Sequence, residues 1–513
     1  MFKGELYPFQ AEAVERMIEA KKLLVAYEMG LGKTVIAIAA TERLIEAGEA
    51  GGSLIICPAS IKHQWLHMLE EFAPDARAIL VNGDRVQRDR QYRDYKGGHA
   101  EYLIINPEQL VNDWEIVSKL PRDVIIADEA QWFKNFKPRR SKKMKRLKAE
   151  YQWALTGQPI ENRAEEAFSI FQWVQPTVLG DFQTFDRAFI VRDHWGRVKL
   201  YKNLPTLHRL LGDHMVRRTR AEVADQLPAV TEQSILVDFD EPGRNCYNRI
   251  LVDLENDILD AVNTWGNFSL SSLYRGEEGQ AQGAIMSKLV CMRMLCDHPE
   301  LLRQSAANFV DEHSKLGSEY AAELQQKGRL DKLILHPKLV TLVSLLEDIL
   351  GADPANKVVV FAYFKGALKL IADTTKDLTK SVFFTGDVKL KDRDAAKQQF
   401  ANDPGTRLFL SSDAGGVGLD LPMANYLISF DLPWSAGVYS QRQSRIIRLS
   451  SVWPRITLIS IRMTDSIEEY QFQLLGQKKR VADAVIDGRG ISPKGRLTLD
   501  LQSLSAFLRT HRV

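Results

Sequence analysis

The chain has 513 residues, which is too long for one compact domain, so we expect at least two domains with sizeable cores. Its net charge of +2 at pH 7 excludes a basic surface over the whole molecule, so any nucleic-acid surface must be a local patch. Four cysteines without a zinc-binding spacing indicate a reducing compartment, and no apolar stretch is long enough to span a bilayer.

The segment Lys22–Ala40 has the layout of a phosphate-binding loop. An apolar run, Leu23–Ala26, predicts a buried strand, and Val35–Ile45 predicts a helix, with the tight turn Gly30–Thr34 between them. Glycines let backbone N–H groups approach phosphates, and the N-terminus of the helix adds favourable partial charge. The layout therefore predicts an ATP site.

Two side chains of this loop carry the predicted chemistry. Lys33 would reach the β- and γ-phosphates, and the hydroxyl of Thr34 would bind Mg²⁺. Upstream, Gln10 has the paired donor and acceptor that can read an adenine edge. A chance glycine turn is the alternative, because the strict pattern has Gly at position 27 and this chain has Tyr27. The predicted ATP-binding residues here are Gln10, Glu28, Met29, Gly30, Leu31, Gly32, Lys33 and Thr34.

Short apolar strands alternate with helical segments through the first half of the chain, which predicts a parallel α/β sheet. Ligands of such sheets bind beyond the carboxyl ends of the strands, and polar residues follow each strand here. The further predicted strands are Ser53–Cys57, Leu103–Ile105, Val124–Ala127 and one that ends at Ala154-Leu155.

Asp128 and Glu129 follow one of these strands and predict the catalytic half of the ATP site. The first carboxylate can hold Mg²⁺, usually through water, and the second can orient and deprotonate the attacking water. A surface acidic pair is the alternative, but Lys33 upstream in the same predicted sheet favours catalysis.

A basic run follows these carboxylates. Residues Trp132–Lys148 include nine lysines and arginines and no acid. Such a run is either a solvated helix face or a contact surface for a phosphate backbone, and the sequence does not favour one over the other.

Several motifs, in this order, resemble those of the Swi/Snf-type helicase-like ATPases of helicase superfamily 2. The resemblance extends from about Leu6 to Arg480, and several ordered motifs are more specific than any one of them. The motifs are MGLGKT, ICPASIKHQW, DEAQ followed by Lys134-Asn135, LTGQPIEN, HMVRRTRAEVADQLP, MLCDHPEL, SSDAGGVGLDL and QRQSRIIR.

Some positions depart from the family pattern. Tyr27 stands where the family usually has Asp, and DEAQ replaces the commoner DEAH. Ser444 and Ile447 stand where the last motif usually shows Asp and His, whereas Arg445 and Arg448 are kept. These departures bear on coupling and rate more than on ATP hydrolysis itself.

The resemblance implies an α/β fold with two RecA-like parallel-sheet lobes in tandem and helical protrusions. Apolar runs in the second half agree, because they predict a second parallel sheet. These runs are Val358–Phe361, Ser381–Phe384, Leu408–Leu410 and Tyr426–Phe430. A separate strand is predicted at Ile235–Val237. The expected division is a first lobe at 1–230 with a protrusion near 161–213, a helical protrusion and linker at 231–335, a second lobe at 336–462, and a terminal helix and tail at 463–513.

The second lobe supplies further predicted site residues. Arg445 and Arg448 are three apart, so on a helix they would share one face and act as arginine fingers on the γ-phosphate. An ordinary basic helix is the alternative, since Arg442 and Arg455 are nearby. The remaining predicted nucleotide contacts are Gln158, Gly418 and Asp420.

Polar residues at other strand ends suit phosphate contacts along a nucleic-acid strand. The predicted nucleic-acid residues are Lys62, Asn106, Lys134, Asn135, Thr385, Gly386, Ser411 and Ser412.

The favoured hypothesis is a translocase that uses ATP and Mg²⁺ to move along double-stranded DNA and to remodel or displace bound protein. The alternatives are a strand-separating DNA or RNA helicase of the same superfamily and a DNA-binding scaffold that does not hydrolyse ATP. We expect a monomer with a protein target or an accessory subunit and no membrane partner. The expected location is the cytoplasm of a bacterium, or a virus in a bacterial host, rather than a nucleus.

Overall fold

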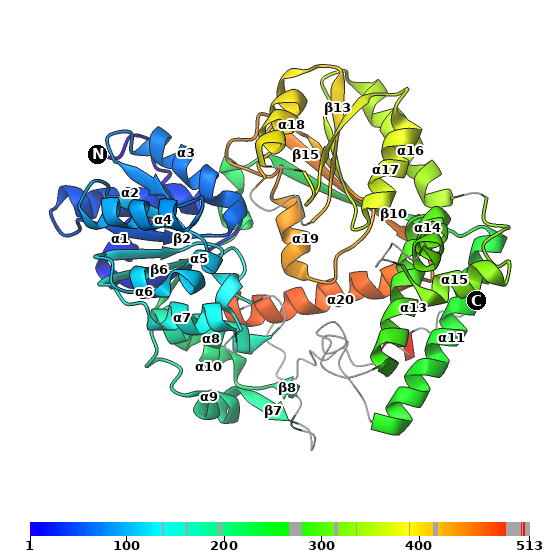
Figure 1. The fold of residues 1–513 in the computed structure, drawn as a ribbon, viewed down its shortest axis with the longest axis horizontal. Coiled ribbons are helices and arrows are strands. Elements are labelled where there is room, and N and C mark those ends of the chain that lie inside the picture. The colour runs from blue at the N-terminus through cyan, green and yellow to red at the C-terminus, as the bar shows by residue number, and fades with distance from the viewer. Residues whose placement is uncertain are drawn as a thin grey trace. The chain divides into compact units, whose positions relative to one another are not determined.

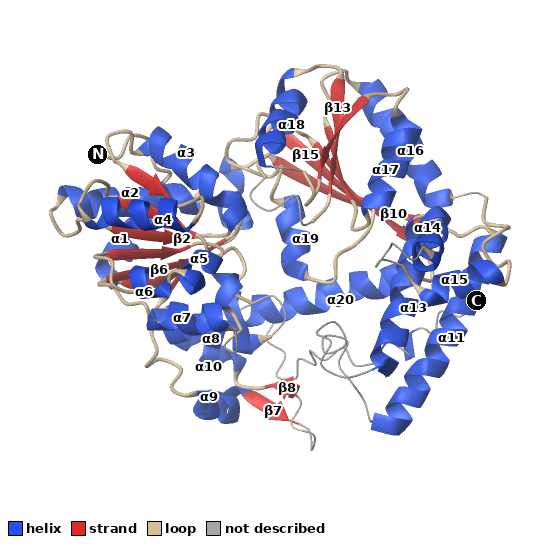
Figure 2. Cartoon of the chain, in the orientation of Figure 1, coloured by secondary structure: helices blue, strands red, loops and turns tan. Residues whose placement is uncertain are grey.

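The computed structural model describes residues 1–135, 138–160, 163–192, 196, 198–265, 280–311, 317–334, 336–388, 390–413, 419–488, 504, 506 and 507. The chain forms two compact units. Unit 1 comprises Met1–Leu227 and Lys478–Leu497, and unit 2 comprises Pro228–Gln477 and Thr498–Val513. Each unit contains one large sheet surrounded by helices (Figures 1 and 2).

Unit 1 has a seven-stranded sheet in the order β3-β4-β2-β5-β6-β1-β9, and every neighbouring pair is parallel. The predicted parallel sheet is therefore confirmed. Both edge strands escaped prediction, because β3 is only three residues long and β9 is half cationic. The strands are β1 (Lys22–Tyr27), β2 (Ser53–Ile56), β3 (Ala78–Leu80), β4 (Tyr102–Ile105), β5 (Val124–Ala127), β6 (Tyr151–Leu155) and β9 (Met215–Arg218).

Unit 1 also contains helices, several of which bury apolar side chains in one core shared with this sheet (Figure 1). The helices are α1 (Pro8–Ala20), α2 (Lys33–Glu46), α3 (Lys62–Phe72), α4 (Arg85–Lys96), α5 (Pro107–Asn112), α6 (Trp114–Val117), α7 (Arg139–Arg146), α8 (Ala164–Val174), α9 (Phe182–Phe189) and α10 (Leu204–Gly212). The segment 161–213, expected to be largely helical, also contains an antiparallel hairpin of β7 (Ile190–Arg192) and β8 (Val198–Tyr201). Residues 161, 162, 193–195 and 197 of that segment lie outside the described residues.

A late segment of the chain completes the core of unit 1. The π-helical turn Asp483–Asp487 packs against α10 and buries Val485 and Ile486. His208 on α10 lies with its Nδ1 atom 3.1 Å from the carbonyl oxygen of Val485. Residues 277 positions apart in sequence are thus brought together in one unit.

Unit 2 has a six-stranded parallel sheet in the order β10-β15-β14-β11-β13-β12. Four of its strands match the predicted runs. A strand at β15 was not predicted, and β10 is longer than the predicted Ile235–Val237 because its first six residues are solvent-exposed and carry no apolar pattern. The strands are β10 (Ala229–Val237), β11 (Val358–Phe361), β12 (Lys380–Phe384), β13 (Thr406–Ser411), β14 (Tyr426–Ser429) and β15 (Arg455–Met463).

The helices of unit 2 are α11 (Glu241–Trp265), α13 (Gln280–Asp297), α14 (Pro299–Val310), α15 (Glu319–Gln326), α16 (Pro337–Ala352), α17 (Lys365–Thr375), α18 (Leu390–Asn402), α19 (Ala436–Gln443) and α20 (Ile467–Ala482), of which the residues from Lys478 onward belong to unit 1. The first four form the helical insertion between β10 and β11 of the second sheet. None of the helices in the described parts of the chain combines the length and the apolarity needed to cross a membrane.

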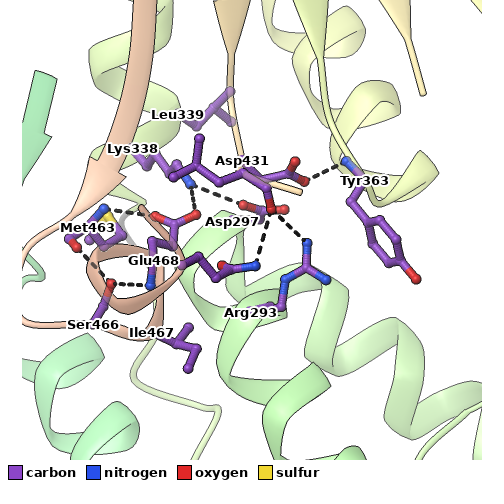
Figure 3. A network of polar contacts seen from close by, with 12 residues as sticks. Arg293, Asp297, Lys338, Leu339, Tyr363, Asp431, Met463, Ser466, Ile467 and Glu468 are labelled. Carbon is purple, nitrogen blue, oxygen red and sulfur yellow. Dashed lines mark hydrogen bonds and ion pairs between the residues drawn. The ribbon is translucent and has the colours of Figure 1, made fainter. Parts of the chain in front are cut away.

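A buried ionic cluster joins this insertion to the sheet of unit 2 (Figure 3). Lys338 on α16 is fully buried, and its ammonium group lies 3.1 Å from a carboxylate oxygen of Asp297 on α13 and 2.5 Å from one of Glu468 on α20. Glu468 also accepts a hydrogen bond from the backbone N–H of Met463, at the end of β15. Three helices and a strand end thus meet at one cation.

Candidate active site

The phosphate-binding loop has the predicted strand–turn–helix geometry. After β1, Gly30 and Gly32 adopt φ values of 90° and 76°, and α2 begins at Lys33. The positive φ of Gly32 favours glycine, and a Cβ atom there would lie 2.4 Å from Nε2 of Gln10, so the Gln10 side chain would have to move. The backbone of the loop is therefore as open as a bound phosphate requires.

Gln10 lies directly on this loop. Its Nε2 group donates to the carbonyl of Leu31 at 3.2 Å, and its Oε1 atom accepts from the backbone N–H of Tyr7 at 3.0 Å. The hydroxyl of Tyr27 donates to the carbonyl of Phe9 at 2.7 Å, and burial raises the pKa of Tyr27 to about 12. Tyr27, which departs from the family pattern, thus links the end of β1 to α1, the helix that carries Gln10.

Lys33 is held over the loop. Its ammonium group donates to the carbonyls of Tyr27 at 2.8 Å and Glu28 at 3.2 Å. Thr34 follows in the first turn of α2 and is half-buried. Glycines with positive φ, a helix N-terminus, an ammonium group and a hydroxyl form a donor set that fits a triphosphate with its cation.

The carboxylates after β5 are held in a specific geometry. Glu129 adopts φ 47° and ψ 51°, a left-handed conformation that a residue with a Cβ rarely takes and that is typical of functional sites. Asp128 is 6% exposed and accepts hydrogen bonds from Nε1 of Trp65 and from the backbone N–H of Glu129, each at 2.8 Å. Burial and the adjacent charge of Glu129 raise the pKa of Asp128 to about 6.

A hydrogen-bonded chain links the end of β6 to Glu129. Thr156 donates its hydroxyl to Oε1 of Gln131 at 2.8 Å, and Nε2 of Gln131 donates to Oε2 of Glu129 at 2.6 Å. Gly157 lies against the phosphate loop, because a Cβ atom there would be 2.6 Å from Cγ of Met29. The ends of β1, β5 and β6 therefore converge, as the sequence predicts for a parallel sheet.

Gln158 is the remaining predicted nucleotide contact in unit 1. Its backbone N–H donates to the hydroxyl of Thr156 at 3.1 Å. Its Oε1 atom is buried and has no hydrogen-bond partner among the described residues. A buried polar atom without a partner beside the phosphate loop fits a site that is completed by a ligand.

The predicted arginines of unit 2 lie near one of the predicted cofactor contacts. Arg445 donates to the carbonyl of Leu419 at 3.1 Å, and Arg448 forms an ion pair with Asp420. The prediction that both arginines share a helix face is wrong, because α19 ends at Gln443. The chain leaves the helix there and buries Ile446 and Ile447 in the apolar core. Gly418 lies outside the described residues.

Two family models cover most of the chain. Residues 9–301, more than half of the chain, match the SNF2-related domain, and residues 339–450 match the helicase conserved C-terminal domain. The chain belongs to the SNF2-related family. It is a Snf2-type helicase-like ATPase of superfamily 2, as the ordered motifs predict.

Individual relatives are similar at a moderate level. The "Uncharacterized ATP-dependent helicase MG018" of Mycoplasma genitalium is 26% identical over 488 residues, which are 93% of this chain and 42% of that protein. The ISWI chromatin-remodeling complex ATPase ISW1 of Saccharomyces cerevisiae is 25% identical over 508 residues, which are 96% of this chain and 41% of that protein. This chain thus spans less than half the length of either relative. The solved SWI2/SNF2 ATPase core of Sulfolobus solfataricus in complex with dsDNA is 25% identical and covers 95% of this chain and 94% of its own, with a TM-score of 0.42.

Sequence reasoning did not assign roles to several residues of this Snf2-type site. Arg217 on β9 donates to the carbonyl of Ala26 at 2.8 Å and pairs with Glu28 at 3.3 Å and with Asp487 at 2.7 Å. Glu28, predicted to contact the nucleotide, therefore directs its carboxylate at Arg217 on β9. The backbone N–H of Arg220, two residues after β9, also donates to this carboxylate at 2.9 Å. The arginine-rich motif HMVRRTR was visible in the sequence, but its partner 270 residues later was not.

Ser444 and Ile447, which depart from the last motif of the family, both make local contacts within unit 2. Ser444 donates its hydroxyl to the carbonyl of Gln441 at 2.8 Å, and Ile447 is 2% exposed within the apolar core. Arg442 does not lie on a solvated basic helix face. It is 1% exposed, and its guanidinium pairs with Asp413 at 2.6 Å and with Asp431 at 3.0 Å. The two carboxylates raise the pKa of Arg442 above its usual value.

The predicted nucleic-acid residues of unit 1 have different surroundings. Lys62 is 5% exposed and donates to the carbonyl of Val81 and, at 3.1 Å, to the side chain of Gln109, and burial lowers the pKa of Lys62 to about 8. A phosphate contact by Lys62 would require it to leave both partners. Asn106 caps α5 by accepting from the backbone N–H of Gln109 at 2.8 Å. In the segment after Glu129, Lys134 pairs with Glu166 at 3.6 Å, and Asn135 is exposed.

The predicted nucleic-acid residues of unit 2 lie at the ends of β12 and β13, as expected. Gly386 is exposed, whereas Thr385 and Ser412 are 8% and 4% exposed. Ser411 is fully buried, and its hydroxyl lies 3.2 Å from the carbonyl oxygens of Phe384 and Ser412. Thr385-Gly386 and Ser411-Ser412 therefore lie at the carboxyl edge of the sheet, and of these four residues only Gly386 is exposed to solvent.

Proposed function

We propose that this Snf2-type chain is an ATP-driven translocase on double-stranded DNA that remodels or displaces bound protein. The observation that carries the proposal is the hydrogen-bonded chain from Thr156 through Gln131 to the strained Glu129, close to the open phosphate loop. It supplies an oriented base within a nucleotide site, which is what phosphoryl transfer to water needs. The yeast relative is named a chromatin-remodeling complex ATPase, which agrees with a remodelling role.

In the proposed reaction, Lys33 leaves the carbonyls of Tyr27 and Glu28 and binds the β- and γ-phosphates. Thr34 and Asp128 would hold Mg²⁺, which neutralises phosphate charge when it is bound. Glu129 accepts a proton from the attacking water, and Gln131 holds the carboxylate in position for that step.

Further residues complete the proposed nucleotide site. Gln10 reads the adenine edge, and the amide of Gln158 supplies its free oxygen to the ligand or to a bound water. Arg445 and Arg448 stabilise charge on the γ-phosphate during transfer, and Arg448 must first leave Asp420. In the best-known systems such an arginine raises the rate by about 10³–10⁵.

The proposed grip on DNA is made through phosphates, so binding is expected to be sequence-independent and sensitive to salt. The residues proposed for it are Lys62, Asn106, Lys134, Asn135, Thr385, Gly386, Ser411 and Ser412. Resemblance to the family suggests movement along the duplex without separating its strands. The bacterial relative is named an ATP-dependent helicase, so a strand-separating motor is the second candidate.

ATP turnover in the presence of different polymers tests the proposal. We expect duplex DNA to stimulate turnover strongly, and single-stranded DNA and duplex RNA to stimulate it weakly, at one low salt concentration. A Glu129→Gln variant is the matched control, since it should bind ATP and turn over very slowly. Stimulation mainly by single strands or RNA would favour the helicase, and absence of turnover with every polymer would favour the non-hydrolysing scaffold.

A further inference from the structure

We propose that one face of α7 binds the phosphate backbone of duplex DNA. The α7 basic face consists of Arg139, Arg140, Lys142, Lys143 and Arg146. The proposal rests on the proposed function and adds to it a surface that none of the motif residues supplies.

Only a narrow face of α7 is anchored in unit 1. Ser141 and Met144 are fully buried, and they lie three residues apart on one side of the helix. Of the α7 basic face, Lys143 is half-exposed and the other four residues are exposed. The helix therefore presents almost nothing but cations to solvent.

Among the described residues, no acid pairs with these cations. None of the five residues forms an ion pair within the described parts of the chain, and the first turn of α7 contains no acid. Neighbours at i+3 and i+4 carry like charges, which repel one another. Helix α4 differs, because two acids, Asp89 and Asp94, lie among its bases and Asp89 is 3.7 Å from Arg85. The surplus charge of α7 is therefore available to an external polyanion.

An aromatic ring orients part of the face. The ammonium of Lys143 lies 4.4 Å, and the guanidinium carbon of Arg146 5.3 Å, from the centre of the ring of Trp114 on α6. Such cation–π contacts reduce the freedom of two long side chains before any ligand binds. Lys145 is not part of the face, because burial lowers its pKa to about 8.

The chemistry of the face favours a phosphate backbone over a protein partner. Protein interfaces depend on buried apolar or aromatic anchors, and the exposed side of α7 has none. Eight helical residues span about 12 Å. One DNA strand places a phosphate every 3.4 Å along the helix axis, so the face can cover roughly three to four phosphates.

The test measures binding of a labelled random-sequence duplex by fluorescence anisotropy, between 50 and 200 mM salt. The variant Arg139→Gln/Arg140→Gln/Lys142→Gln removes three charges from the face. The matched control Arg90→Gln/Arg93→Gln/Lys96→Gln removes three from α4, where acids are interspersed. We expect the slope of log affinity against log salt to fall by about two to three for the α7 variant, with affinity at least about tenfold lower near 100 mM salt. The α4 variant should bind almost as the wild type does.

The outcomes separate this proposal from the proposed function. If the wild type binds duplex DNA and the α7 variant keeps its affinity and slope, the α7 basic face is excluded while the translocase proposal stands. An equal loss in the α4 variant would also overturn the proposal, since net charge alone would explain it. If the wild type itself shows no salt-sensitive binding, the proposed function fails first. The variant Arg139→Lys/Arg140→Lys keeps the charge and should keep the slope of log affinity against log salt. A smaller slope in this variant would contradict the electrostatic explanation.

Discussion

Substitution of Lys338 by methionine should strongly destabilise unit 2. The ammonium group is 0% exposed, and it separates two carboxylates, those of Asp297 and Glu468, that are 1% and 3% exposed (Figure 3). Methionine fills similar space but leaves both acids buried without a cation. Removing one partner of a buried ionic cluster costs about 3–5 kcal/mol, since the remaining charges lose their compensation.

Thermal unfolding of the full chain measures this loss. Each kcal/mol shifts the midpoint of a unit of this size by roughly 2–4 °C, so the transition of unit 2 should fall by about 10 °C. The effect should also depend on pH. Burial raises the pKa of Asp297 well above its usual value, so the folded state retains a proton that the unfolded chain has released. Lys338 opposes this rise, so in the variant Asp297 takes up its proton still more readily and is buried uncharged in acid. A carboxyl group with a raised folded pKa contributes stability in acid that is lost as the pH rises. The variant should therefore lose less stability at pH 5 than at pH 8.

Lys365→Met is the matched control. That lysine also pairs with an acid, Asp387, but the two side chains are 49% and 75% exposed. Exposed pairs contribute little, so its transition should move by no more than about 2 °C. An equal shift in the two variants, or a loss for Lys338→Met that grows toward low pH, would refute the assignment of the cluster as a stabilising one.

Three substitutions test the site of unit 1. Trp65→Phe removes the N–H donor to Asp128, so the Mg²⁺ concentration for half-maximal turnover should rise roughly tenfold, and an unchanged Mg²⁺ titration would contradict this. Gln131→Ala removes the hydrogen bond to Glu129, so kcat should fall while nucleotide affinity, measured with a fluorescent ATP analogue, stays unchanged. Weaker nucleotide binding with a normal kcat would count against this role of Gln131. Asp487→Asn weakens the ion pair with Arg217, which is packed between the phosphate loop and Asp487, so KM for ATP should rise more than kcat falls. A fall in kcat alone would argue against a role of Arg217 in positioning the loop.

Sequence patterns predicted the elements whose residues are locally diagnostic. The strands at β1, β2, β4 and β5 are continuous apolar runs, and the glycine turn after β1 requires positive φ, so each was visible from the chain alone. The carboxylates after β5 and the amide after β6 were placed at one edge by the rule for parallel sheets.

Features that depend on distant partners could not be predicted. The sequence places Lys62 shortly after a predicted strand, which suits a phosphate contact. Only the fold shows that its ammonium group donates hydrogen bonds to Val81 and Gln109. Spacing allowed Arg445 and Arg448 to share a helix face, but the competing burial of two isoleucines ended the helix at Gln443. Burial of this kind depends on tertiary packing, which outweighs local periodicity.

Displacement of a third strand from a DNA triplex tests the central claim most directly. A translocase that tracks along the duplex should release the third strand in an ATP-dependent manner and leave the two duplex strands paired, and Glu129→Gln should release none. Release of single strands from the duplex itself, or release of the third strand without ATP hydrolysis, would contradict the proposal that this Snf2-type chain is a translocase on double-stranded DNA.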